Sequence, residues 1–249
     1  MLSNMKPKLF LAVPLLALVL VFGFFVNSMP YKGVPILVYH EIGPVGSGDS
    51  EMFIDRAVFR SHMEHLKKHG YTTITLRELY AHYAEGAQLP QKPVVLTFDD
   101  GYVGVYENGW PIMRELGFTG VLFVTGHLGQ PGYMTESQVE TLLANGFELG
   151  NHTRTHRSLP TLNDEELADE IVIFQRELES RFGVDVVSFC YPMGDYDKRV
   201  VAAVRQAPLY IGVTTMEGFA CASQGLLTLH RVPIFRFDTM ASFRRKLRR

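Results

Sequence analysis

Short apolar runs alternate with amphipathic stretches from Gly33 to the C-terminus, and this alternation limits the folds open to the chain. A strand that is apolar along its whole length needs cover on both faces, which is typical of parallel sheets packed under helices. We therefore expect an α/β protein built on a parallel sheet. The runs that predict strands are 35–39, 94–98, 121–124, 147–149, 186–190, 210–213 and 226–229.

The amphipathic stretches between these runs predict helices with recognisable ends. Phe59, Met63 and Leu66 recur at helical spacing, and a glycine follows them. A second helix is expected over 135–144, which opens with the Thr-x-x-Gln pattern of a capping box. A long third helix is expected over 163–181, which opens with an Asn cap and ends just before a glycine.

Four histidines and one polar segment are assigned to the surface. His62, His65, His69 and His82 lie within predicted helices, and we expect them to be ordinary exposed helix residues. Residues 49–55 follow a segment rich in glycine and proline, so we expect a surface loop there.

The polar residues that could bind a metal or act in catalysis follow the predicted strands at their carboxyl ends, as they do in (β/α) barrels. An open, doubly wound sheet would place a site at the same edge. We expect the barrel. The predicted architecture is a distorted (β/α) barrel of about seven strands. A chain of 249 residues can form it as a single domain, over residues 31–249.

The first 30 residues form a separate segment. Lys6 and Lys8 precede an unbroken apolar run over 9–26. A cationic flank before such a run predicts a signal peptide or a membrane anchor, with a buried core helix as the alternative. The rest of the chain is then expected outside the cytoplasm, either periplasmic or secreted, or anchored to the cytoplasmic membrane. The basic run 243–249 predicts a solvated helix end, with contact to anionic lipid or polymer as the alternative.

Charge and cysteine content exclude some classes of protein. The formal net charge of −2 gives no indication of a nucleic-acid partner. Cys190 and Cys221 are the only cysteines, so the chain has no disulfide framework. The two residues could pair in an oxidising compartment, and the sequence leaves that open.

Two adjacent carboxylates, Asp99 and Asp100, follow the predicted strand 94–98 directly. Gly101 allows the chain to turn sharply after them. Adjacent side chains of an extended chain point to opposite sides, so each carboxylate can face a different part of a pocket. The alternative is a solvated Asp-Asp-Gly turn, which is common in proteins.

About fifty residues further on, His152 and His156 are spaced i, i+4 and can share one face of a turn. Two imidazoles and one carboxylate form a ligand set for Zn²⁺, or for Co²⁺ or Ni²⁺, that leaves positions open for water and substrate. Two chance histidines in a polar loop are the alternative. The combined motifs predict metal-assisted hydrolysis, with one carboxylate left for proton transfer.

These motifs, in this order, closely resemble the polysaccharide deacetylase family, the NodB-type carbohydrate esterases of family 4. The resemblance covers nearly all of the chain from Val34 onward. It includes the opening Pro-Ile-Leu-Val-Tyr-His that ends at His40. It continues through the Thr-Phe-Asp-Asp-Gly run at 97–101 and the Asn-His-Thr-Arg-Thr-His run at 151–156, and it includes the Phe-Cys-Tyr-Pro-Met-Gly run at 189–194.

The resemblance implies a role for each matching residue. It implies that Asp100, His152 and His156 bind the metal, and that Asp99 is the general base for the attacking water. It also implies that the backbone around Tyr191, Pro192 and Met193 binds the carbonyl oxygen. Asn151 and Thr155 are expected to shape the turn rather than to bind the metal. His40 is expected to be a pocket wall or to support the ligands, with a hydrogen-bonded core histidine as the alternative.

Two departures from the family pattern leave roles open. Cys190 stands where the best-known form of the third motif has an arginine that orients the base, so the partner of Asp99 is unknown. We expect Cys190 to be a small buried residue. The run 227–230 resembles the last motif, in which the histidine, here His230, is the general acid. A second alignment makes Arg231 the pocket residue instead.

The main hypothesis is a metal-dependent deacetylase acting on an N-acetylated polysaccharide outside the cytoplasm. Peptidoglycan, a chitin-like polymer and poly-N-acetylglucosamine are the candidate substrates. One alternative is an O-acetyl esterase of the same family. The others are a non-catalytic glycan-binding module and a membrane-tethered scaffold.

Overall fold

The structure, a computed structural model, describes residues 33–44 and 50–248. The predicted signal peptide or anchor at 1–30 lies outside these residues. No helix within the described part of the chain combines the length and the apolar character needed to cross a bilayer.

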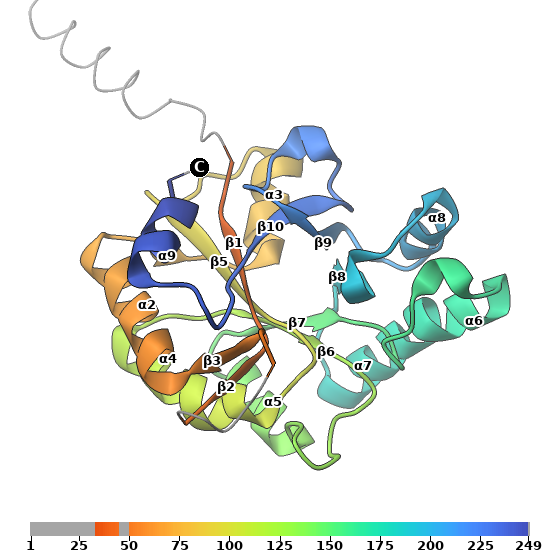
Figure 1. Cartoon of the computed structure of the whole chain (residues 1–249). Helices are drawn as coiled ribbons and strands as arrows, with labels where there is room; N and C mark the ends of the chain where they lie inside the picture. Colours follow the sequence, from red (N-terminus) through yellow and green to blue (C-terminus); the bar gives the residue numbers. More distant parts are fainter. Residues whose placement is uncertain (1–32, 45–49, 249) are drawn as a thin grey trace, which may run out of the picture. The chain divides into compact units, whose positions relative to one another are not determined.

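Seven parallel strands close into a barrel, as predicted (Figure 1). Each strand pairs in parallel with the next one along the chain, and the last pairs with the first, so the ring has no open edge. Helices lie outside this ring. The strands are β1 (Ile36–Tyr39), β5 (Pro93–Phe98), β6 (Val121–Val124), β7 (Glu148–Asn151), β8 (Ser188–Cys190), β9 (Ile211–Glu217) and β10 (Leu229–Pro233).

Three short strands lie outside the ring. β4 (Thr72–Thr73) pairs with the first two residues of β5. β2 (Glu41–Gly43) and β3 (Phe53–Asp55) form a separate two-stranded parallel sheet. The prediction of a loop throughout 49–55 is therefore wrong at its end. Phe53 and Ile54 are both buried, and their apolar side chains place this segment against the core instead of in solvent.

The helices begin and end largely where the sequence indicates. α5 starts with the predicted capping box, since the Thr135 hydroxyl accepts a bond from the Gln138 N–H, and the Gln138 side chain accepts one from the Thr135 N–H. The α-helices are α2 (Arg56–Lys68), α3 (Leu76–Glu85), α4 (Trp110–Leu116), α5 (Glu136–Leu143), α6 (Asp164–Ala168), α7 (Phe174–Phe182), α8 (Lys198–Gln206) and α9 (Met240–Lys246). Short 3₁₀ segments cover Leu159–Thr161, Pro192–Gly194 and Ala222–Gln224, and a π-turn over Val105–Gly109 precedes α4.

The long helix predicted over 163–181 is present but is not uniform. It begins at the Asn163 cap and ends before Gly183, which adopts a left-handed conformation. Between α6 and α7 it contains a π-helical turn, η3 (Asp169–Ile173). Turns of this kind often occur at functional sites, because they redirect backbone groups that an α-helix would use internally.

Both faces of the barrel strands are buried, which explains their continuous apolar runs. Alternate residues belong to two separate apolar clusters. Ile36, Val95 and Val121 lie in one cluster, and their neighbours on the same strands lie in the cluster packed under the helices. The positions that continue the alternation of Ile36, Val95 and Val121 past the carboxyl ends of their strands therefore reach the mouth of the barrel, where a site can form.

His62 is buried in α2, so the prediction that it is exposed is wrong. Its Nδ1 lies 3.3 Å from the Tyr39 hydroxyl, and its ring stacks on Phe243 with the ring centres 4.0 Å apart. Helical spacing alone did not separate this position from the solvent face, because α9 covers α2 there. Burial lowers the pKa of His62 to about 4, although Asp238 opposes the shift; His65 and Lys246 add to it.

We predict that His62 makes the fold acid-sensitive. An unfolded histidine has a pKa near about 6.5, so the unfolded chain binds the proton more readily. The contribution of His62 is complete above that pH and is lost as the pH falls toward about 4, a change of about 3 kcal/mol. In His62→Gln, the difference in free energy of unfolding between pH 7.5 and pH 4.5 should shrink by most of that amount, as measured by urea denaturation.

The control for this test is His82→Gln, which changes a helix histidine at the surface. It should leave the pH dependence of unfolding as in the parent protein. An unchanged pH dependence in His62→Gln would show that other groups set the acid sensitivity.

Candidate active site

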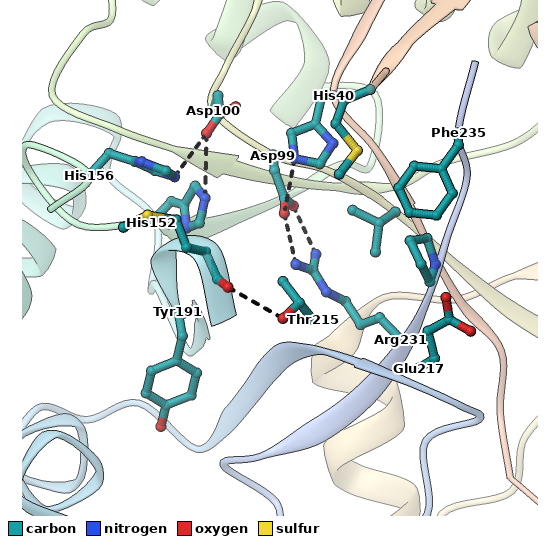
Figure 2. A pocket seen from close by; sticks show the side chains of 14 residues that line it. His40, Asp99, Asp100, His152, His156, Tyr191, Thr215, Glu217, Arg231 and Phe235 are labelled. Carbon is teal, nitrogen blue, oxygen red and sulfur yellow. Dashed lines mark hydrogen bonds and ion pairs between the residues drawn. The ribbon is translucent and has the colours of Figure 1, made fainter. Parts of the chain in front are cut away.

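The predicted site residues meet at the mouth of the barrel (Figure 2). Asp99 and Asp100 follow β5, and His152 follows β7. His156 lies one turn further along the same loop. Because parallel strands of a barrel end at one rim, residues fifty positions apart in sequence come within contact distance.

Asp100, His152 and His156 form a compact triad of metal-ligand type. The Asp100 Oδ1 lies 3.4 Å from the Nε2 of each imidazole. One ligand atom from each residue lies within 4.8 Å of the other two. Two nitrogens and one carboxylate at this separation suit Zn²⁺, Co²⁺ or Ni²⁺.

The hydrogen bonds of His152 show that its ring is set for coordination. Its Nδ1–H donates to the Cys190 carbonyl over 2.8 Å. In the neutral imidazole, the Nε2 lone pair then faces Asp100 and His156, as it does in histidines that bind a metal. The triad thus fits a divalent cation by its donor chemistry and by the tautomer that the backbone imposes.

A second cluster, formed by Asp99, His152 and Cys190, is also compact enough to hold an ion. Its donors are committed elsewhere, however. Asp99 is bound by a guanidinium, and burial raises the pKa of the Cys190 thiol, which disfavours the thiolate that a metal requires. The Asp100 triad is therefore the better metal site. No disulfide joins Cys190 and Cys221.

Tight turns bring the ligands together. Asp100, Thr153, His156 and Met193 have positive φ angles of 55° to 72°, and within the described residues Lys92 is the only other non-glycine residue with positive φ. Such backbone conformations cost free energy and persist only where surrounding contacts enforce them. Their concentration around one pocket is typical of a functional site.

The π-turn η3 supplies some of those contacts. Asn151 donates to the Ile171 carbonyl over 2.9 Å and accepts the Thr153 N–H over 2.7 Å. The buried carboxylate of Glu170 accepts both the N–H and the hydroxyl of Thr155. Asn151 and Thr155 are therefore placed as predicted, in the turn and away from the metal position.

Asp99 is buried and paired with Arg231, the partner that the sequence left unidentified. Arg231 donates from Nη1 to Oδ1 over 2.9 Å and from Nη2 to Oδ2 over 2.8 Å. Burial alone would raise the pKa of Asp99, but the guanidinium holds it well below its usual range. The carboxylate is therefore ionised, and its remaining lone pairs can accept a proton.

Arg231 is itself held on all sides. Its side chain is 1% exposed, its Nε donates to the Thr214 carbonyl over 2.9 Å, and its Nη1 donates to the Thr97 hydroxyl over 3.1 Å. Its Nη2 lies 3.1 Å from the Cys190 sulfur. Cys190 thus lies beside the guanidinium of Arg231, whose side chain extends from β10. Cys190 is the small buried residue that was expected.

The triad and Asp99 open into a pocket of about 360 Å³. Tyr191 and Met193 line it, and Pro192 is buried between them. The Tyr191 N–H already donates to the Val213 carbonyl over 3.3 Å, and proline has no N–H. Among these three residues, the Met193 N–H is the backbone donor that remains for a ligand oxygen, so the predicted oxyanion role rests on it.

His40 and His230 occupy different positions. His40 lines the pocket with its Nε2 3.9 Å from the Asp99 Oδ2, and its Nδ1 is buried without a hydrogen-bond partner in the described chain. His230 does not line the pocket. Its side chain leaves β10 on the opposite side from Arg231. It lies beside Gly218, where an added Cβ would be 3.1 Å from the His230 Nδ1. The predicted acid role of His230 has no geometric support and stays a prediction.

Six further lining residues were not predicted as part of the site. They come from β1, from the segment before β3, from the end of β9, and from the end of β10 and the corner after it, and their names are Val38, Met52, Thr215, Glu217, Pro233 and Phe235. The apolar run at 226–229 led to a predicted strand that stops where β10 begins. A strand placed four residues later would have put the residues after Pro233 at the rim.

Comparisons with known proteins agree with this geometry. The family model described as Polysaccharide deacetylase matches residues 86–212. YxkH of Bacillus subtilis (strain 168), provisionally named a polysaccharide deacetylase, is 30% identical over 202 residues, which are 81% of this chain and 71% of that protein. The poly-beta-1,6-N-acetyl-D-glucosamine N-deacetylase of Staphylococcus aureus (strain MRSA252) is 24% identical over 179 residues, which are 66% of this chain and 61% of that protein.

A similar fold occurs in a solved structure, that of the deacetylase PplD of Streptococcus pyogenes in complex with acetate. The TM-score is 0.82 at 24% identity, and the match covers 87% of this chain and 99% of that chain. This likeness shows the fold alone.

We predict that Arg231→Met destabilises the protein by about 3–5 kcal/mol, because Asp99 is left as a buried charge without a partner. Urea denaturation measures the change. The double variant Asp99→Asn, Arg231→Met should recover much of the loss, since neither charge then remains. A loss below about 1 kcal/mol in the single variant would mean that water reaches Asp99 and replaces the arginine.

Proposed function

The chain belongs to the polysaccharide deacetylase family, and we propose that it is a metal-dependent hydrolase that removes acetyl groups from N-acetylated sugars. The observation that carries this proposal is the convergence of Asp100, His152 and His156 within 4.8 Å, beside the buried carboxylate of Asp99. A ligand triad next to a fixed, ionised base is the arrangement that hydrolysis of an amide requires.

The proposed hydrolysis gives each residue of the triad, Asp99 and Arg231 a role. Asp100, His152 and His156 would hold a divalent ion, with Zn²⁺ preferred and Co²⁺ or Ni²⁺ as alternatives. When bound, such an ion lowers the pKa of water and polarises the acetyl carbonyl. Asp99 accepts the proton of the attacking water, while Arg231 keeps the carboxylate ionised and in place.

His40 is the group placed to return a proton to the departing amine. It lines the pocket beside Asp99, whereas His230 lies on the far side of β10. A sugar amine is a poor leaving group unless it is protonated as the bond to the acetyl carbon breaks. Burial lowers the pKa of His40, so its imidazole is neutral at rest, and the proton it gives to the amine is the one that Asp99 takes from the attacking water. We therefore assign the acid role to His40 in place of His230.

The proposed substrate is a polymer of N-acetylated glucosamine outside the cytoplasm. The Staphylococcus aureus relative is named for action on poly-beta-1,6-N-acetyl-D-glucosamine, and it supports this class of substrate. Peptidoglycan and chitin-like chains offer the same acetamide group. The apolar run over 9–26 supports export, with the segment either cleaved or kept as an anchor.

We predict that the purified protein, loaded with Zn²⁺, releases acetate from N-acetylglucosamine oligomers, and that a chelator abolishes the release. Asp100→Ala, His152→Ala and His156→Ala should each weaken metal binding, as measured by calorimetry. Asp99→Asn should keep the metal but lose turnover by about 10²-fold or more, because it removes the base and not a ligand.

The control is Asp164→Asn, which changes an exposed aspartate at the start of α6 and should retain full turnover. No acetate release after metal is restored would refute the hydrolase. Full turnover in Asp99→Asn would refute its role as base. In cell fractions, acetate release should be found with the periplasmic, secreted or membrane material.

We predict that His40→Gln slows acetate release from an N-acetylated sugar by about 10²-fold but slows release from 4-nitrophenyl acetate much less. Nitrophenolate leaves without a proton, so the acid is needed only for the amine. Equal losses on both substrates would indicate that His40 supports the pocket structure rather than donates a proton. His230→Gln is the matched variant and should retain turnover on both.

A further inference from the structure

One side of the pocket is an apolar wall made of Met52, Pro233 and Phe235. Figure 2 shows Phe235 on the side away from His156, with Asp99 and Arg231 between them. The pocket therefore has a polar end that holds the reacting groups and an apolar end that takes no part in the chemistry. Ligand pockets commonly use such apolar surface for affinity and a few polar groups for orientation.

Lys246 of α9 holds Phe235 in this wall. Its Nζ lies 4.8 Å from the centre of the Phe235 ring, over one face of it. The same ammonium donates to the Pro233 carbonyl over 2.8 Å and to the Asp238 carboxylate over 2.5 Å. Asp238 in turn accepts the Phe235 N–H over 2.8 Å. One lysine thus fixes both the ring and the corner of the chain that carries it.

These contacts are shielded from solvent. The side chains of Lys246 and Asp238 are 14% and 10% exposed. The third member of the wall is tied to the same corner, because the Arg236 N–H donates to the Glu51 carbonyl over 2.7 Å, next to Met52. The apolar wall is therefore a braced unit and not a set of loose surface side chains.

The exposure of Phe235 indicates that packing is not its sole role. Phe243 of α9 is fully buried, as a core phenylalanine should be, whereas Phe235 is only partly buried and faces the pocket. Lys246 occupies one face of the ring, and the remaining apolar surface borders the cavity. An aromatic surface fixed beside a reactive centre suits a ligand with a flat apolar face.

We propose that the apolar wall binds the C–H face of a pyranose ring of the substrate, and that Lys246 is the positioning residue that keeps Phe235 in place for it. This inference rests on the proposed function, since it names how the sugar is held while its acetyl group is at the triad. Thr215 and Glu217 of β9 line the same pocket and offer polar groups to the hydroxyl edge of the ring.

The test uses steady-state acetate release from the N-acetylglucosamine tetramer by the Zn²⁺-loaded protein. Phe235→Ala should raise KM by about tenfold and change kcat much less, because the wall contacts the sugar equally before and during the reaction. Phe235→Leu should give an intermediate KM. Lys246→Met should raise KM by about threefold, and Lys246→Arg should restore it, because a guanidinium can also donate and lie over a ring.

Two matched controls come from the same chain. Phe237→Ala removes an exposed phenylalanine, 79% accessible, two positions along and outside the pocket lining. Lys67→Met removes an ammonium that lies 5.7 Å from the ring of Phe118 on another surface. Both should leave KM and kcat as in the parent protein. A thermal unfolding curve for each variant shows that it is folded, and Phe235→Leu replaces Phe235→Ala if the latter is not.

An unchanged KM in folded Phe235→Ala or Phe235→Leu would overturn the inference while leaving the hydrolase intact. A fall in kcat alone would overturn it as well. If the parent protein releases no acetate, calorimetric binding of the same tetramer decides the question. Weaker binding to the Phe235 variants than to Phe237→Ala supports the wall although the hydrolase fails, and equal or absent binding refutes it.

Discussion

A carboxylate and a guanidinium buried together at the mouth of the barrel are the contact on which the site depends. Burial alone would raise the pKa of Asp99, because it disfavours the charged carboxylate. Arg231 keeps it charged and aims it, while three other groups, the Thr214 carbonyl, the Thr97 hydroxyl and the Cys190 sulfur, contact the guanidinium. A pair of this kind adds little net stability, but loss of either partner is costly. Its value lies in presenting a charged base at a fixed position.

The metal triad depends on strained backbone conformations that hydrogen bonds stabilise. The positive φ angles at Asp100 and His156 turn their side chains toward one point, and such conformations need support from outside the loop. The π-turn η3 provides it by turning a carbonyl and the Glu170 carboxylate toward the histidine loop. The irregular turn in the long helix and the irregular loop are therefore two halves of one arrangement.

Much of this could be predicted from the sequence, for physical reasons that also explain the failures. Barrel strands are apolar on both faces, so their runs were recognisable, but the polar ends of β9 and β10 were not. Motif spacing predicted Asp99, Asp100 and the two histidines as one site. It left His230 and Arg231 both open, because neighbours on a strand point to opposite sides and a pattern does not tell which side is inward. The contact between Lys246 and the corner at Phe235 is tertiary, so the basic run 243–249 predicted a solvated helix end, or contact with anionic lipid or polymer, and gave no sign of this contact.

The closure of the barrel by its first and last strands has a consequence for how the protein matures. Arg231 follows Asp99 by 132 positions, and β10 is the last in chain order of the seven strands that form the ring. Until that strand docks beside β1, the carboxylate has no counter-ion and the ring remains open at one seam. The charged pair therefore belongs to the closed barrel and cannot form in a partly folded chain in which β1 and β10 have not yet met.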